Sequence, residues 1–415
     1  MRVHPRLVVA AAACLALLGV GVVTWRVTTP DTYVAPTTGA ADAPSDRARP
    51  AAAVVALADL QRAITRRDVT AVERLAPPDD ATASSLLASV VQNAQALDLR
   101  DVVIRFIDST GGGVDAEGRW SGTADVSWRI AGFDRGTARM EVPFTFRNVG
   151  DRGVAVESAD PDQGTVPLWL QGPLQVRKAP DVLVMVSGTS QEARTYDRLA
   201  QRAVPVVEKV LPSSRVSLVV EVPSSAAALD AMLGADPGTY ENVAAVTTSP
   251  DGVVSVGSPV HVFVNPDEMN RLKPTGAQVV MSHEATHAVT DAPLSQAPQW
   301  LVEGFADYVA LRDVKLPLST TAAQIIAQVK ADGVPAALPG TAEFDTASTH
   351  LGAAYEAAWL ACRLIARVAG QDALVRLYDK LASGGDVDAT LRRVTGLSLA
   401  EVTGRWRTQL DRLAR

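Results

Sequence analysis

The amino-acid sequence predicts an α+β protein built from two folded units. The 415 residues exceed the usual size of one domain, and the composition, 47% hydrophobic and 20% charged, supplies enough apolar side chains for real cores. Apolar residues between 51 and 160 recur first at helical spacing and then with a period of two. Short apolar strands then precede a region, from residue 275 to the end, in which helical spacing dominates.

The first element along the chain is an uncharged apolar run over residues 7–25, preceded by two arginines and closed by Arg26. Nineteen residues span about 28 Å as a helix, close to the thickness of a bilayer's hydrocarbon core. This length and the interfacial Trp25 favour a retained signal anchor over residues 1–26; a cleaved signal peptide is the alternative. We expect a single-pass protein of the cell membrane with its N-terminus inside and its later domains extracytoplasmic, or a secreted protein if the segment is cleaved.

The next segments predict a linker and an accessory domain. Residues 27–50 are rich in Pro, Thr, Ala and Asp without periodicity, which is typical of a flexible linker. The accessory domain is expected over residues 51–165. Its first part shows two helical patterns separated by a Pro-Pro pair, and its second part alternates apolar and polar residues between Gly/Asp turns. Helices followed by a curved antiparallel sheet resemble the NTF2/cystatin-like class in the order of their elements.

The second unit is expected over residues 175–415, after a link near 161–179. A helix is expected at 190–210, and from residue 275 onward the chain is almost entirely helical in pattern. The apolar runs of this unit predict strands at 181–187, 215–222, 243–248, 253–256 and 260–265.

Composition excludes some classes of function. A net charge of −7, a pI near 5.4 and the lack of a Lys/Arg cluster with interleaved aromatics argue against nucleic acid as a partner. The two cysteines are not expected to pair, because Cys14 lies in the apolar run and Cys362 in a helical pattern; we interpret Cys362 as a small buried apolar residue. The oligomeric state is not indicated.

The strongest chemical signal is the sequence HEATH at positions 283–287. On a helix, which Thr275 is expected to cap, His283 and His287 lie one turn apart on the same face. Their ring nitrogens can bind one tetrahedral ion at about 2.0–2.1 Å. Glu284, between them, can take a proton from an attacking water and later deliver it to the leaving amine.

A second helical segment supplies the missing ligand. A catalytic zinc requires a third protein ligand and an open position for water. Glu303, in the segment PQWLVEGFADY, can provide a carboxylate oxygen. Asp307, four residues later on the same helix face, can accept the outer N–H of a ligand histidine and fix its ring. The sequence therefore predicts one Zn²⁺ ion held by His283, His287 and Glu303.

HEATH followed by WLVEGFADY resembles the gluzincin zinc metallopeptidases, in particular the peptidase MA-like and aminopeptidase N-type catalytic domains. The resemblance covers roughly residues 180–370. It implies a zincin-type domain, a small sheet followed by a mostly helical half, with two histidines and a downstream Glu on the zinc and the Glu within the motif as general base. These roles fall on His283, His287, Glu303 and Glu284.

The resemblance extends to a helix that opens with a Tyr-Glu pair, in the segment AAYEAAWLACRLIARVAG. In the family this Tyr donates its hydroxyl to the oxyanion of the reaction, which implies that role for Tyr355. A ring packed inward at a helix start is the other interpretation of Tyr355. His350 is the alternative donor, or a surface residue that caps the helix.

The chain also departs from the aminopeptidase N-type pattern. Fifteen residues separate His287 from Glu303, fewer than in those enzymes, and the Gly-x-Met-Glu-Asn element that binds a free substrate amine is lacking. Cleavage of terminal residues is therefore in doubt. The strand at 260–265 is one hypothesis for a cleft edge that accepts an extended peptide, and the other short strands could serve as well; such an edge would suit an endopeptidase.

Together these features predict zinc-dependent hydrolysis of peptide bonds in extracytoplasmic peptides or proteins. The alternative is a membrane-tethered, zinc-containing binding or sensor protein that has a peptidase-like fold and no turnover; an intact Glu284 argues against it. A third possibility is that residues 51–160 cover the cleft as an autoinhibitory or substrate-selecting domain. The substrate itself is not indicated by the sequence.

Overall fold

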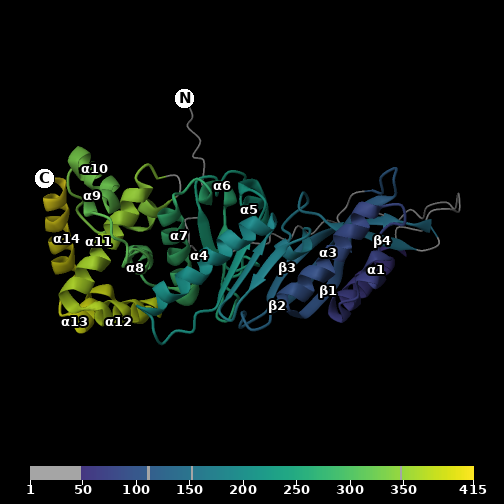
Figure 1. Cartoon of the computed structure of the whole chain (residues 1–415), viewed down its shortest axis with the longest axis horizontal. Helices are drawn as coiled ribbons and strands as arrows, with labels where there is room; N and C mark the ends of the chain where they lie inside the picture. Colours follow the sequence, from purple (N-terminus) through teal and green to yellow (C-terminus); the bar gives the residue numbers. More distant parts are fainter. Residues whose placement is uncertain (1–47, 110–112, 151–152, 346–347) are drawn as a thin grey trace, which may run out of the picture.

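Two β-sheets and the helices around them form the described part of the chain. The computed structural model describes residues 48–109, 113–150, 153–345 and 348–415. Figure 1 shows the first sheet with its helices at one end, the second sheet in the middle, and a helical region at the other end. The mixed α+β class predicted from the sequence is confirmed.

The first unit packs helices on a four-stranded antiparallel meander, ordered β1-β2-β3-β4. Strand β2 alternates buried and half-buried residues along its whole length, so only one of its faces is fully buried. Side-chain oxygens of Asp68 and Asp80 accept backbone N–H groups and start the second and third helices. The elements are α1 (Ala48–Arg66), α2 (Val69–Glu73), α3 (Ala81–Leu97), β1 (Leu99–Ser109), β2 (Arg119–Ile130), β3 (Ala138–Asn148) and β4 (Val154–Ala159).

The second sheet has five strands in the order β5-β6-β7-β9-β8. The three central strands are parallel, and the two edge strands pair antiparallel to their neighbours. A short 3-10 helix, η2, precedes it, and two helices lie between its strands. The elements are η2 (Leu168–Leu170), β5 (Gln175–Lys178), β6 (Val182–Val186), α4 (Ser190–Glu208), β7 (Leu218–Val222), α5 (Ala226–Met232), β8 (Ala245–Thr248) and β9 (His261–Val264).

Three expectations for this sheet were wrong. Strand β5 lies inside the predicted link, where it pairs with β6. Residues 253–256 form no strand, because Gly252 and Gly257 turn the backbone on either side and Val256 is 96% exposed. Strand β9 is not a cleft edge, because it pairs with β7 on one side and β8 on the other; the edge strand is β8.

The second sheet separates two hydrophobic cores. Alternate residues of a strand point to opposite faces, so Val184, Val220 and Val262 lie in the core shared with α4 and the helical region. Their neighbours Met185 and Phe263 lie in the core of the first unit instead. Because both faces of the sheet are covered at its centre, strands β6 and β7 are buried along their whole length and almost entirely apolar.

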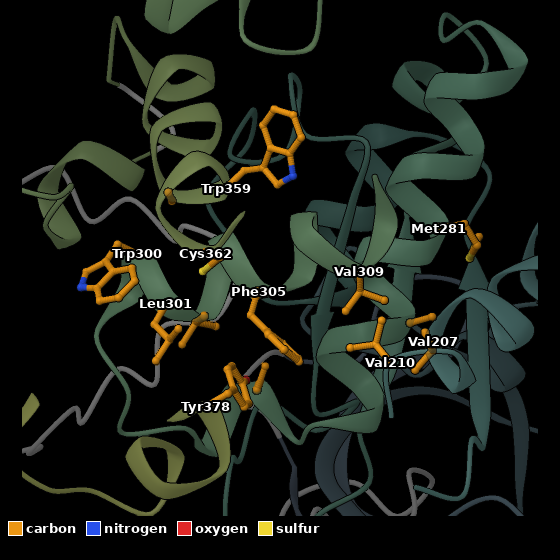
Figure 2. Close-up of a cluster of buried hydrophobic side chains, with 14 of the residues drawn as sticks. Val207, Val210, Met281, Trp300, Leu301, Phe305, Val309, Trp359, Cys362 and Tyr378 are labelled. Atoms are coloured by element: carbon orange, nitrogen blue, oxygen red, sulfur yellow. The ribbon is translucent and has the colours of Figure 1, made fainter. Parts of the chain in front are cut away.

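The helical region follows the second sheet. Figure 2 shows its core around α8 and α11, where Phe305 stacks on Tyr378 with ring centroids 4.6 Å apart. Cys362 is fully buried there, which confirms its interpretation as a small apolar residue. The elements are α6 (Pro266–Met269), α7 (Pro274–Val289), η3 (Ala292–Leu294), α8 (Gln299–Ala310), α9 (Leu318–Thr321), α10 (Ala323–Asp332), η4 (Thr341–Phe344), α11 (Leu351–Ala369), α12 (Gln371–Ala382), α13 (Val387–Thr395) and α14 (Leu399–Ala414).

Among the residues that the structure describes, no helix combines the length and the apolar character required to cross a membrane. The predicted anchor over residues 1–26 lies outside the described residues, as does most of the predicted linker over residues 27–50. The last residues of that linker already belong to α1, which begins at Ala48.

Candidate metal centre

Helix α7 carries the HEATH sequence. It begins at Pro274, whose fixed φ suits the first helical position, so Thr275 lies within the first turn and the expectation that it caps the helix was wrong. Residues 281–287 are all buried, because α7 packs against α4, α8 and the edge strand β8. The motif therefore lies between α4, α8 and β8.

Helix α8 brings the third predicted ligand to α7. Its Gly304 lies against α11, where an added Cβ atom would be 2.4 Å from the carbonyl oxygen of Ala358. Only glycine permits this close approach of the two helices. With α8 held there, the neighbouring Glu303 is completely buried and faces the histidines of α7.

The three predicted ligands meet at one point. The Nε2 atoms of His283 and His287 are 2.9 Å apart, and each lies 3.2 Å from Oε2 of Glu303. Ligand atoms around a tetrahedral zinc ion are about 3.3 Å apart at zinc–nitrogen distances of ~2.0–2.1 Å. The exposed fractions are 8% for His283, 1% for His287 and 0% for Glu303. This buried group could hold a metal ion.

Asp307 orients the first histidine of the group. Its Oδ1 lies 2.8 Å from Nδ1 of His283. A carboxylate only accepts hydrogen bonds, so Nδ1 carries the proton and the Nε2 of a neutral His283 ring presents a lone pair to the cluster. A carboxylate behind a histidine in this way is the usual support for a metal-binding imidazole.

Gln299 orients the carboxylate of Glu303 in a similar way. Its Nε2 donates a hydrogen bond of 2.7 Å to Oε1 of Glu303, which leaves Oε2 for the two imidazoles. Sequence reasoning missed this residue. The signal was present, since Gln299 precedes Glu303 by four residues on one helix face.

The charge balance of the cluster favours a cation. Burial alone would raise the pKa of Glu303, but the positive charge of His287 and hydrogen bonds from both histidines lower it to about 2. Burial disfavours a charged His283, yet Asp307 above all, with Glu303 and Glu284, raises the pKa of His283 well above its usual value. A metal ion bound here would therefore take the place of a proton that the carboxylates otherwise hold on the rings.

Glu284 is buried beside the cluster and takes no part in it. It is 4% exposed, and its Oε2 accepts a hydrogen bond of 2.6 Å from the hydroxyl of Thr247 on β8. Among the described residues, the group that could hold a metal ion comprises His283, His287 and Glu303. Thr247 was also missed by sequence reasoning, because nothing in a predicted strand tells which helix its side chains face.

The two candidate donors for an oxyanion differ in position. The Tyr355 ring on α11 is half-buried, with its centroid 6.0 Å from that of the His283 ring and 5.3 Å from that of Phe344. His350 occupies the N-cap position of α11, is exposed, and makes no capping hydrogen bond through its side chain. The structure therefore places Tyr355, and not His350, in contact with a residue of the cluster.

Two comparisons with known proteins found no match. No protein-family model matches the chain, and no curated protein matches it. The function is therefore inferred from the residues of the buried group and from the elements that carry them.

Proposed function

We propose that this chain is a zinc-dependent peptidase of the gluzincin type, which hydrolyses peptide bonds in extracytoplasmic peptides or proteins. The observation that carries the proposal is a buried carboxylate, Glu284, next to three converging ligand atoms but outside the metal-binding group. A purely structural metal site has no need of such a group. A hydrolase needs it as a general base.

We also propose a finer division of the fold. Residues 51–165 form an NTF2/cystatin-like accessory domain, and residues 175–415 form a zincin-type domain. Helices on an antiparallel meander support the first assignment. The second is supported by a small sheet with an antiparallel edge strand, followed by neighbouring helices that carry the ligands.

Zinc is the proposed metal because two imidazoles and one carboxylate are a common ligand set of catalytic zinc sites. Bound there, a zinc ion would polarise the substrate carbonyl and acidify the attacking water. Gln299 and Asp307 hold the side chains of Glu303 and His283 in the orientations that such a site requires.

The remaining side chains have separate roles in the proposed reaction. Glu284 takes the proton of the attacking water and later delivers it to the leaving amine. Tyr355, in ring contact with His283, donates its hydroxyl to the negative charge that develops on the carbonyl oxygen. Both groups are supplied by helices that pack against α8.

The edge strand β8 is the proposed docking site for an extended peptide. The hydrogen bond from the Asn265 N–H to the Ala244 carbonyl shows which residues of β8 bond to β9: Ala244 does, and every second residue after it. By that alternation the backbone groups of Ala245 and Thr247 point away from β9, toward the outer side of the sheet. A substrate paired there would leave both its ends free, as an endopeptidase requires.

The proposed location is the outer face of the cell membrane, with the segment over residues 1–26 as a single anchor. The proposed partners are a peptide or protein substrate and the membrane itself. The net charge of −7 gives no support for a nucleic acid as a further partner.

Cleavage of a peptide library by the purified chain tests the proposal. Activity is expected to disappear with a chelator and to return with zinc. Glu284→Gln should keep its zinc and lose activity by about 10²–10⁴-fold, the usual contribution of a general base. A wild-type chain that keeps zinc and cleaves no peptide would contradict the proposal and support the zinc-containing binding protein.

A further inference from the structure

We propose that Thr247 is a positioning residue of this reaction, which fixes one oxygen of the Glu284 carboxylate from the edge strand of the sheet. The inference rests on the proposed function and adds a residue to it that no feature of the HEATH sequence indicates. It assigns to β8 a part in the reaction besides holding the substrate.

The contact itself is short and buried. The hydroxyl oxygen of Thr247 lies 2.6 Å from Oε2 of Glu284, in the range of hydrogen bonds to an ionised carboxylate. It also lies 3.2 Å from the Glu284 carbonyl oxygen, but a hydroxyl has one proton, and the shorter contact assigns that proton to the carboxylate. Thr247 is 0% exposed and Glu284 4%, so bulk water does not compete for either group.

The sheet directs this hydroxyl toward α7. Alternate residues of β8 point to opposite faces, and Val246 belongs to the core of the first unit, whereas Ala245 belongs to the core on the α7 side. Thr247 therefore faces α7, and β8 is itself fixed by its pairing with β9. The buried hydrogen bond to Glu284 holds the hydroxyl in this direction.

This contact selects which oxygen of the base can act. The Thr247 hydroxyl donates its hydrogen bond to Oε2 of the Glu284 carboxylate. Oε1 is left to accept a proton. Because β8 also carries the backbone groups proposed to bind the substrate, one strand sets the position of both the peptide and the base.

Loss of the hydroxyl should therefore change catalysis more than binding. Thr247→Val keeps the shape, the branched Cβ and the backbone groups of the strand, and removes only the hydrogen bond. A misplacement of a catalytic group by about 1 Å can lower a rate by ~10²-fold. We expect kcat to fall about 10–100-fold, with KM within about 3-fold of wild type and the zinc content unchanged.

The chain offers a matched control. Thr145 on β3 also donates a hydrogen bond to a carboxylate, 3.0 Å from Oδ2 of Asp160, but it does so in the first unit. Thr145→Val removes a bond of the same kind and should leave kcat and KM unchanged. Thr247→Ser restores the hydroxyl and should recover kcat to within about 3-fold of wild type.

The experiment measures kcat, KM, zinc content and thermal unfolding for the purified full chain and these three variants. A fall of kcat in Thr247→Val alone, recovered in Thr247→Ser, supports the inference. An unchanged kcat, a rise in KM alone, a loss of zinc, or no recovery by serine overturns it while the peptidase proposal stands. A wild-type chain that contains zinc and cleaves nothing overturns both.

Discussion

At the residue scale, the hydrogen-bond partners of two histidines determine how their rings could receive a metal ion. The single N–H of a neutral His283 is directed to Asp307, so its Nε2 presents a lone pair. The His287 Nε2, 2.9 Å away, can either donate to that lone pair or bind a metal. If Nε2 of His287 binds a metal, the ring proton must lie on Nδ1, which is buried without a hydrogen-bond partner among the described residues. An unsatisfied buried N–H would oppose binding by about 1–3 kcal/mol.

Asp307 should accordingly be required for tight metal binding. In Asp307→Asn the neutral amide no longer favours the ring orientation and basicity that a negative carboxylate imposes on His283. We expect zinc affinity to fall about 10–100-fold, measured by competition with a chelator of known affinity. The control is Asp313→Asn, at an exposed residue that pairs with Lys209. Equal zinc affinity in wild type and Asp307→Asn would contradict the assigned role.

Residues within one helix were easier to predict than contacts between elements. The spacing of His283 and His287, and that of Glu303 and Asp307, follows directly from the helical repeat. The contact of Thr247 with Glu284 depends on the order of strands in the sheet and on which face of β8 meets α7. No periodicity in the sequence carries that information.

At the scale of elements, the close packing of α8 on α11 places the third ligand. Gly304 follows Glu303 directly, and its lack of a side chain lets α8 contact the backbone of α11 at Ala358 and the thiol of Cys362. Any atom added there would push α8 away from α11 and shift Glu303 relative to the histidines.

Gly304→Ala should therefore destabilise the protein although alanine favours helices. The added methyl would lie 2.4 Å from a backbone oxygen, so we expect a loss of about 1–3 kcal/mol in the free energy of unfolding, measured with urea. Gly404→Ala in α14 is the control, since an added Cβ there meets nothing within 4 Å. That variant should gain up to about 1 kcal/mol. A Gly304→Ala protein as stable as wild type would exclude this packing.

The elements that were predicted well are those with their own periodic pattern. Helix α4 repeats its buried residues at helical spacing, and strands β6 and β7 are short runs of buried residues; all three lie within the predicted ranges. Strand β5, with the sequence QVRK, has no such pattern and exists through its pairing with β6. The valines near 253 resemble a strand but have no neighbouring strand to pair with, so hydrophobicity alone misled the prediction.

At the scale of the whole molecule, a buried charged group joins the first unit to the second sheet. His261 on β9 places Nδ1 2.7 Å from Glu221 on β7 and Nε2 2.9 Å from Asp134, which follows β2 in the first unit. In the sequence, the sign of this group is His261 itself, an ionisable residue in the otherwise apolar strand HVFV. Both contacts use ring nitrogens, so a protonated His261 can donate to both carboxylates at once.

The stability of this junction should depend on pH. Burial alone would lower the pKa of His261, but Asp134 and Glu221 raise it to about 10. The folded protein holds the His261 proton more tightly than the unfolded chain does. The contribution of His261 to the free energy of unfolding is therefore complete below the ordinary histidine pKa of ~6.5, and it is lost as pH rises toward 10. We expect the free energy of unfolding to fall between pH 7 and 10 in wild type.

His261→Gln isolates that contribution. The variant leaves the two carboxylates without a cation and should lose about 3–5 kcal/mol at pH 7, and its stability should change less between pH 7 and 10. Urea unfolding at several pH values measures both quantities. The same slope with pH in wild type and variant would show that His261 does not carry the effect.

The most direct test of the metal centre is the zinc content of the purified chain, measured by mass spectrometry of the elements. One zinc ion per chain is expected in wild type, and almost none in His287→Ala and in Glu303→Ala. His350→Ala, at an exposed residue outside the cluster, should keep its zinc. A wild-type chain without bound metal, or zinc retained in both ligand variants, would contradict the account.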